Sequence, residues 1–298
     1  MQLMYIRVML YSNLISLMRS TVFTKTRLNR KCVGIGRLCG NLGPICRSDD
    51  MITEKNYEGD FMFLRKIVLL RENIPSFHRY PFSIPSIKTM EELDIKSKVT
   101  FFVGENGTGK STLLEAIAEK CGFNTAGGGR NNYYDVHASE SALGDYIRLS
   151  WLPKATKGFF FRAETYHHFA SHIDDVAAYD AYGGRSLHEQ SHGESFLSLF
   201  SNRFNGKAIY LLDEPEAALS PQRQLTFLRI MHELVTTGDS QFIIATHSPI
   251  ILGYPGATIY SFDHGTIEEI EYEMTDHYQI TRYFLQHREK FLQQILED

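Results

Sequence analysis

The sequence of 298 residues contains no apolar run of the ~18 residues that a membrane-spanning helix needs, so none of it is expected to cross a membrane. It also lacks a heptad pattern and an internal repeat, which argues against a long inserted coiled coil. Its few cysteines, Cys32, Cys39, Cys46 and Cys121, match no common zinc spacing. We interpret them as thiols in a reducing compartment.

Excess positive charge is missing from most of the chain. Residues 1–50 hold eight Lys and Arg but two Asp, a net charge of +6, and since the whole chain is at −4 the remainder is at −10. An acidic body of this kind argues against broad, nonspecific binding of nucleic acid, although it leaves room for a local basic groove.

The basic segment at the start differs in composition from everything that follows. We expect residues 1–60 to be an N-terminal extension outside the fold and residues 61–298 to form one domain. The segment fits an organelle transit peptide, a flexible basic tail, or a wrongly chosen start codon with Met51 or Met62 as the true start. The protein is expected in the cytoplasm, unless a genuine leader directs it into an organelle.

From Phe61 onward, short apolar runs alternate with stretches of helical periodicity, which predicts an α/β fold with a mostly parallel sheet flanked by helices. A small antiparallel part is expected from Phe63–Arg71 with Tyr80–Ile87 as an edge strand, because Pro81 and Pro85 confine the latter to an edge. Further strands are expected at Lys98–Val103, Tyr146–Trp151, Gly158–Arg162, Ala208–Leu212 and Gln241–Thr246, with a hairpin of Ala257–Phe262 and Thr266–Tyr272. Helices are expected at Lys110–Cys121, Glu194–Phe204, Pro221–Val235 and Tyr278–Leu296, the last capped by Thr275 or Asp276, and a short helical or lid region is expected besides.

A glycine-rich turn between a buried strand and a helix carries the strongest motif. Residues 104–111 read Gly-Glu-Asn-Gly-Thr-Gly-Lys-Ser, which satisfies the phosphate-loop pattern. Glycines let consecutive backbone N–H groups approach phosphate oxygens, and the helix beginning at Lys110 adds its positive dipole end. The pattern predicts binding of ATP with Mg²⁺, in which Lys110 neutralises the phosphates and Ser111 coordinates the metal. The residues expected to bind the nucleotide here are Gly104, Glu105, Asn106, Gly107, Thr108, Gly109, Lys110, Ser111 and Thr112.

Two acids follow a later buried strand, and a histidine follows the next one. Asp213 and Glu214 come directly after Ala208–Leu212, and His247 comes after Gln241–Thr246. Ligands of open α/β sheets bind at the carboxyl ends of the strands, so these side chains are expected near the phosphates. We predict that Asp213 holds Mg²⁺ through water, that Glu214 is the general base, and that His247 fixes the catalytic water at the γ-phosphate.

In this order the motifs resemble the ABC-type ATPases, particularly the branch that contains SMC, RecF and similar nucleotide switches. Residues 104–111 look like Walker A, Asp213-Glu214 like Walker B with its catalytic glutamate, Glu216–Ser220 like the D-loop and His247 like the switch histidine. Leu187–Ser195 resembles the signature segment, and Ser191, Gly193 and Glu194 match it. More narrowly, the chain resembles compact bacterial ATPases of the AAA group. The resemblance covers residues 61–298 and implies a head-to-tail homodimer with two ATP molecules between the subunits, each γ-phosphate being covered by the partner's signature helix.

The signature and the Q-loop depart from the family pattern. His192 stands where glycine is usual and Gln190 where leucine is usual, and the Q-loop glutamine is missing, with Arg162 or Glu164 near its place. A lone group of histidines, His167, His168 and His172, has no further ligand placed by the sequence and is interpreted as solvated or packed.

Three functions fit the phosphate loop. The first is a nucleotide switch in DNA repair or defence, with DNA or a DNA-processing protein as partner. The second is the nucleotide-binding subunit of an ABC membrane transporter, which expects the missing Q-loop glutamine and an intact signature. The third is a hexameric AAA+ motor, which needs an arginine finger and a helical lid that the sequence does not place. We favour the first.

Overall fold

A computed structural model describes residues 62–130, 142–175, 192–204 and 206–296. The predicted N-terminal extension, residues 1–60, lies outside these ranges, so the expected domain boundary stays a prediction. In the described ranges, no helix combines the length and the apolar character needed to cross a membrane.

A six-stranded sheet lies at the centre of the part of the chain that is described, and its strand order is β5-β6-β7-β3-β8-β9. The first five strands are parallel to their neighbours, and only β9 pairs antiparallel, with β8. This confirms the predicted parallel sheet and the closing hairpin. The strands are β3 (Val99–Val103), β5 (Gly158–Arg162), β6 (Ile209–Asp213), β7 (Gln241–Ala245), β8 (Thr258–Ser261) and β9 (Glu268–Glu269).

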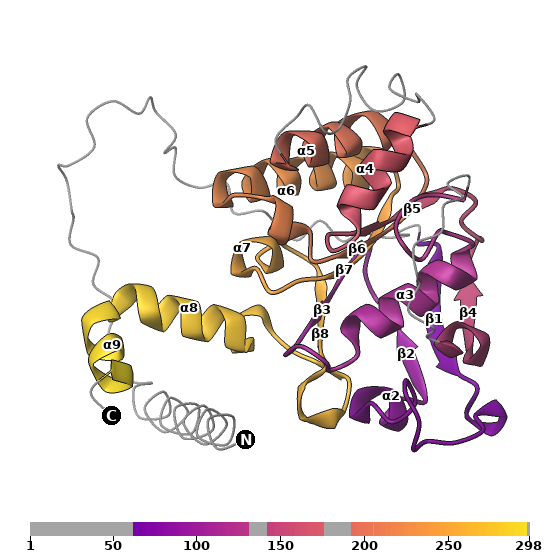
Figure 1. Ribbon diagram of the computed structural model, residues 1–298, viewed down its shortest axis with the longest axis horizontal. Coiled ribbons are helices and arrows are strands. Elements are labelled where there is room, and N and C mark those ends of the chain that lie inside the picture. Colours follow the sequence, from indigo (N-terminus) through magenta and orange to yellow (C-terminus); the bar gives the residue numbers. More distant parts are fainter. Residues whose placement is uncertain (1–61, 131–141, 176–191, 205, 297–298) are drawn as a thin grey trace. The chain divides into compact units, whose positions relative to one another are not determined.

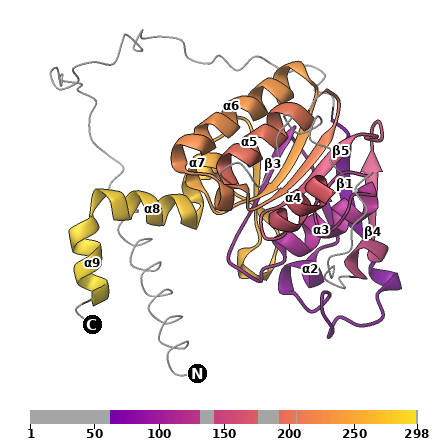
Figure 2. The ribbon, with the colours of Figure 1, turned by 45° about the horizontal axis from the view of Figure 1, so that its top comes forward.

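Apolar side chains alternate between the two faces of this sheet and build two separate cores. Phe102, Leu211 and Ile243 pack on one face with helix α3 (Lys110–Cys121). Phe101 and Ile244 pack on the other face, which is covered by four helices (Figures 1 and 2). These helices are α4 (Tyr166–Asp175), α5 (His192–Arg203), α6 (Pro221–Thr237) and α7 (Pro249–Leu252). Both faces are covered, which explains why β3, β6 and β7 are buried along their whole length and mostly apolar.

A smaller antiparallel sheet, in the order β2-β1-β4, lies on the far side of α3 (Figure 1). Its strands are β1 (Leu64–Leu69), β2 (Glu92–Asp94) and β4 (Ile147–Trp151). The buried amide of Gln241 on β7 joins it to the central sheet. Gln241 Oε1 accepts hydrogen bonds from the backbone N–H groups of Phe63 (3.1 Å) and Leu64 (2.8 Å), and its Nε2 donates to the Leu64 carbonyl at 2.9 Å. A side chain thus bridges two sheets that share no strand pair.

The partner of β1 differs from the prediction. Tyr80–Ile87 does not form an edge strand, since this stretch contains a turn and then helix α2 (Pro85–Thr89). Proline at the first position of a helix is favoured because its missing N–H would have no acceptor there, and Pro85 occupies that position. The strand that pairs with β1 on this side is β2, and β4 pairs on the other, so β4 and β5 lie in different sheets.

The C-terminal part also differs, because the expected single helix is two. Thr275 caps α8 (Asp276–Gln286) by accepting from the Tyr278 N–H, as predicted. The helix ends at His287, whose backbone φ of −134° is not helical, and α9 (Arg288–Leu296) follows. Both helices extend away from the central sheet beyond α7 (Figure 2).

Candidate active site

The phosphate loop has the backbone conformation that its glycines allow. Gly104, Gly107 and Gly109 all have positive φ, at 138°, 83° and 103°, which other residues seldom adopt. At Gly109 a side chain would also meet the Oγ of Ser86 at 3.0 Å. The Ser86 hydroxyl in turn donates to the Thr108 carbonyl, so α2 supports the loop from outside.

Lys110 begins α3 and folds back over the loop. Its Nζ donates to the carbonyls of Gly104 (2.6 Å) and Glu105 (2.9 Å), and the side chain is buried. Burial lowers the pKa of this amine, and the carboxylates around it, Glu214 first among them, act in the opposite direction. The positive charge therefore lies inside the loop where a phosphate would need it.

Asp213 and Ser111 connect the loop to the end of β6. The Ser111 hydroxyl donates to Asp213 Oδ1 at 2.9 Å, across 102 positions of sequence. Burial raises the pKa of Asp213 to about 6, although this hydrogen bond and Arg162 favour the ionised form. A buried carboxylate of this kind suits a divalent cation, because an added positive charge would offset the cost of burying the negative one.

Arg162 lies opposite Asp213 at the end of the neighbouring strand. Its guanidinium contacts three carboxylates: Glu115 at 3.2 Å, Glu164 at 3.1 Å and Asp213 at 3.9 Å. At the place of the missing Q-loop glutamine, the structure therefore brings both Arg162 and Glu164 into the lining of the site, paired with each other.

Glu214 and His247 face each other across the ends of β6 and β7. Glu214 has a φ of 51°, an uncommon value for a residue other than glycine, and its side chain is 45% exposed. The His247 Nε2 atom lies 3.6 Å from Glu214 Oε1. Glu216 holds this segment by accepting from the His247 N–H and, at 2.7 Å, from the Thr246 hydroxyl. A carboxylate and an imidazole thus meet beside the loop, as predicted.

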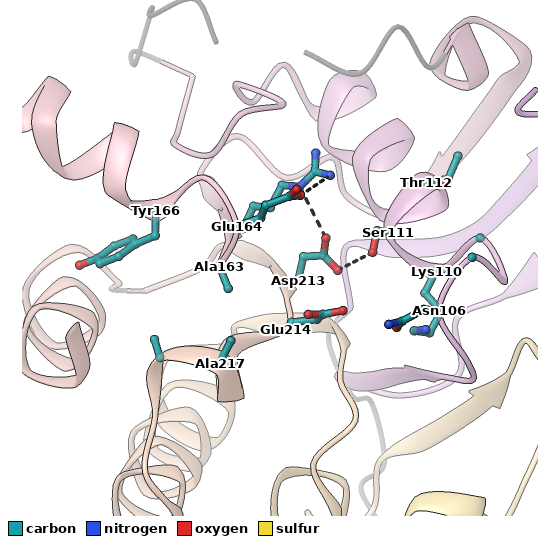
Figure 3. Close-up of a pocket in the computed structure, with 14 residues that line it drawn as sticks. Asn106, Lys110, Ser111, Thr112, Ala163, Glu164, Tyr166, Asp213, Glu214 and Ala217 are labelled. Atoms are coloured by element: carbon teal, nitrogen blue, oxygen red, sulfur yellow. Dashed lines mark hydrogen bonds and ion pairs between the residues drawn. The ribbon is translucent and has the colours of Figure 1, made fainter. Parts of the chain in front are cut away.

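One pocket of about 510 Å³ is lined by Lys110, Ser111, Arg162, Asp213 and Glu214; His247 is not among its lining residues and lies next to Glu214. Figure 3 shows Ser111, Asp213 and Glu214 together at its centre, with Lys110 and Asn106 on the loop side. The pocket is also lined by Gly107, Gly109, Thr112, Ala163, Glu164, Tyr166, Ala217 and Ala218. The other predicted loop residues serve the loop itself: Thr108 donates to the Glu105 carbonyl at 2.8 Å.

The predicted signature segment is described only in part. Ser191 lies outside the described residues, and for Gly193 and Glu194 the structure gives the backbone alone, in the first turn of α5. The helix expected after Ser191 is confirmed. Its contribution to a nucleotide site stays a prediction.

Two residues at the site were missed by the sequence analysis. Asp263 follows β8 and accepts from the Glu105 N–H at 2.9 Å; an acid after an apolar strand was the available signal. His277, in the first turn of α8, lies 2.7 Å from the His247 ring, measured between His277 Nε2 and His247 Nδ1. Nothing in the local sequence indicates that contact.

Two family models match the chain. A model of the AAA ATPase domain matches residues 191–252, which contain Asp213, Glu214 and His247, and a model of the AAA domain matches residues 73–164, which contain the phosphate loop and Arg162. The two matched ranges thus contain the residues on both sides of the pocket, the phosphate loop and Arg162 in one and Asp213 and Glu214 in the other. No curated protein matches the sequence.

Solved structures with a similar arrangement include an SMC head domain and two proteins of ABC transporters. The SMC head domain from Thermotoga maritima is 18% identical, with a TM-score of 0.37 over 70% of this chain and 100% of that one. An ATP-binding cassette of an ABC transporter is 15% identical, with a TM-score of 0.43 over 77% and 97%. A putative metal-chelate type ABC transporter is 15% identical, with a TM-score of 0.43 over 74% and 88%. At these values the similarity carries no argument about what the chain acts on.

Proposed function

We propose that this chain, a P-loop ATPase of the ABC type, binds ATP with Mg²⁺ between the phosphate loop and the carboxylate pair and hydrolyses it to ADP and phosphate. The observation that supports this best is the hydrogen bond from Ser111 to Asp213, because it joins two motifs 102 positions apart at one point. The pocket around this point also contains the lysine and the glutamate that the reaction needs.

The phosphate loop and the carboxylate pair hold different parts of the bound Mg-ATP. Lys110 exchanges its bonds to loop carbonyls for bonds to the β- and γ-phosphates. The Ser111 hydroxyl and the Asp213 carboxylate are oxygen ligands of the kind Mg²⁺ prefers, and Asp213 acts through water. When bound, Mg²⁺ offsets negative charge on the phosphate oxygens.

Glu214 and His247 act on the attacking water. The half-exposed Glu214 carboxylate accepts its proton as general base, and His247 orients it at the γ-phosphate. The left-handed backbone of Glu214 aims the side chain into the pocket rather than along the strand. The loss of a positioned base lowers the rate by about 10²–10⁴-fold.

Two variants test this proposal against a matched control. Lys110→Ala is expected to lose Mg-ATP affinity in titration calorimetry, and Glu214→Gln is expected to bind ATP but turn over at least about 10²-fold more slowly. Glu233→Gln, an exposed carboxylate on α6 paired with Arg229, is the control and should match the parent in both assays. Unchanged binding in Lys110→Ala would refute the nucleotide site, and parent-like turnover in Glu214→Gln would assign the base elsewhere.

We further propose that ATP pairs two copies of the chain. Glu214 is 45% exposed, so the γ-phosphate next to it would meet solvent in a single subunit. A second subunit, placing Ser191 and the start of α5 over that phosphate, would exclude water; the helix N-terminus favours an anion there. Glu214→Gln with ATP should then sediment as a dimer that ADP does not support, and adding Ser191→Arg should leave a monomer that still binds ATP. A dimer indifferent to Ser191→Arg would exclude this arrangement.

The work driven by this cycle is proposed from the resemblance to SMC and RecF proteins. We propose a nucleotide switch in DNA repair or defence, with DNA or a DNA-processing protein as partner. The Glu214→Gln variant, held with ATP, is the form to use in a pull-down followed by nuclease treatment and identification of the bound species. Recovery of neither nucleic acid nor a DNA-processing protein would contradict this role.

A further inference from the structure

His277 is an unassigned histidine that touches the ring of His247. We propose that it is a positioning residue: its Nε2–H donates to Nδ1 of His247 and holds the proton of His247 on Nε2, on the side of Glu214 and the phosphates. The inference rests on the proposed function, because it gives His247 the hydrogen-bond donor that an anionic γ-phosphate needs.

The two rings are close enough for one strong hydrogen bond. His277 Nε2 and His247 Nδ1 are 2.7 Å apart, and the ring planes are inclined by 48°. On the opposite side of the His247 ring, Nε2 is buried and makes no hydrogen bond in the structure. Glu214 Oε1 lies 3.6 Å from this nitrogen, beyond hydrogen-bond distance.

Electrostatics decides which nitrogen carries the proton. Of two imidazoles sharing one hydrogen bond, one must donate and the other accept. If His247 donated from Nδ1, its Nε2 would present a lone pair to the Glu214 carboxylate, and two acceptors would face each other at 3.6 Å. If His277 donates, His247 presents Nε2–H to the Glu214 carboxylate, which lines the pocket, and this arrangement is favourable. The second arrangement follows from the charge of Glu214.

The His247 ring, as the acceptor, is neutral in this arrangement. Burial lowers the pKa of His247 and of His277, and the Lys110 charge acts in the same direction, whereas nearby carboxylates, Glu214 for His247 and Glu105 for both rings, raise it. A hydrogen bond between Nε2 and Nδ1 needs a neutral acceptor, so the lowered pKa values agree with the geometry.

The backbone around both histidines holds this distance. Tyr272 Oη donates to the Pro249 carbonyl at 2.9 Å, two residues after His247. The buried Thr275 caps α8 two residues before His277. The first turn of α8 is therefore anchored to the segment that follows β7, and His277 approaches from a fixed direction.

Nitrogen-detected NMR of the protein labelled in its histidine rings tests the assignment directly. His247→Gln identifies the His247 signals by their loss. The parent should show His247 protonated on Nε2, with Nδ1 as a hydrogen-bond acceptor, and His277→Leu should show a mixture of both tautomers. Protonation of His247 on Nδ1 in the parent would overturn the proposal, whatever the protein hydrolyses.

Kinetics then separate positioning from packing. His277→Leu fills similar space without a donor and should lower kcat by about 10- to 100-fold, the range known for second partners of functional histidines at metal sites, with KM for ATP little changed. His277→Gln keeps an N–H donor and should recover most of the rate. In a His247→Ala background, His277→Leu should have little further effect, because it acts only through His247.

His232, on α6, is a matched control. Its Nδ1 contacts the Tyr254 hydroxyl at 3.0 Å, and it does not line the pocket. His232→Leu should leave kcat unchanged. Equal loss in His277→Leu and His277→Gln, or a loss that persists in the His247→Ala background, would overturn the positioning role while Lys110→Ala and Glu214→Gln still report on the ATPase itself.

Discussion

The buried carboxyl of Asp213 should make the metal-free protein less stable as pH rises. Its pKa is raised from 3.8 to about 6, with burial as the main cause, so the folded protein binds this proton more tightly than the unfolded chain. A proton held more tightly in the folded state stabilises it at low pH, and that stabilisation is lost as pH rises from about 4 through 6. At 1.36 kcal/mol per pKa unit, the full effect is about 3 kcal/mol, of which about 1.4 kcal/mol falls between pH 5.0 and 7.5.

Asp213→Asn isolates this effect, because the amide keeps an acceptor for the Ser111 hydroxyl but does not titrate. Urea unfolding of parent and variant, in EDTA and without nucleotide, should show the free energy of unfolding of the parent falling by about 1.4 kcal/mol relative to the variant between pH 5.0 and 7.5. Glu216 also has a raised pKa, but it is present in both proteins and cancels in the difference. Parallel pH profiles would refute the reasoning, since Asp213 would then be ionised without cost in the folded state.

Three further predictions concern the scaffold and the loop. Gln241→Leu should lower the free energy of unfolding, measured in urea, by about 2–5 kcal/mol, since two backbone N–H groups and one carbonyl lose their buried partner. A loss under about 1 kcal/mol would mean that water replaces the amide. Gly109→Ala should abolish tight ATP binding, because its φ of 103° and the contact at 3.0 Å both oppose a side chain, whereas Gly256→Ala, with a φ of 72° and open space, should leave binding intact. A chain beginning at Met62 should keep the melting temperature and ATPase rate of the full chain; a clear fall in either would show that the preceding segment packs on the domain.

The motifs were predictable because each consists of residues that are neighbours in the sequence and that together indicate one kind of chemistry. Lys98–Val103, the loop after it and Lys110–Cys121 were placed almost residue for residue, since a buried strand, positive-φ glycines and a capped helix are local signals. The approach of Asp213 to the phosphate loop followed from the rule that ligands of open α/β sheets bind at the carboxyl ends of the strands, whereas its hydrogen bond with Ser111 was not predicted.

The wrong expectation at Tyr80–Ile87 came from taking its prolines as marks of an edge strand, whereas Pro85 at the first position of a helix was the local signal to follow. Other features depended on contacts between distant segments. The approach of His277 to His247, which lie 30 positions apart, is a tertiary contact of this kind. Helix α4 was missed because its histidines and acids make the segment polar overall, so that the apolar periodicity of the buried Phe169 and Ile173 is hard to recognise in the sequence.

The hydrogen bonds of the Gln241 amide couple the small sheet to the central sheet, so a spectroscopic signal from one sheet can report on the unfolding of both. Trp151, the one tryptophan in the sequence, ends β4 in the small sheet, whereas the pocket belongs to the central sheet. Because these hydrogen bonds and α3 tie the two sheets together, tryptophan emission and far-ultraviolet circular dichroism should trace one unfolding curve. In Gln241→Leu both curves should move to lower urea concentration and still coincide, because α3 packs against both sheets. Comparing tryptophan emission with circular dichroism in the unlabelled protein therefore shows whether the two sheets unfold together.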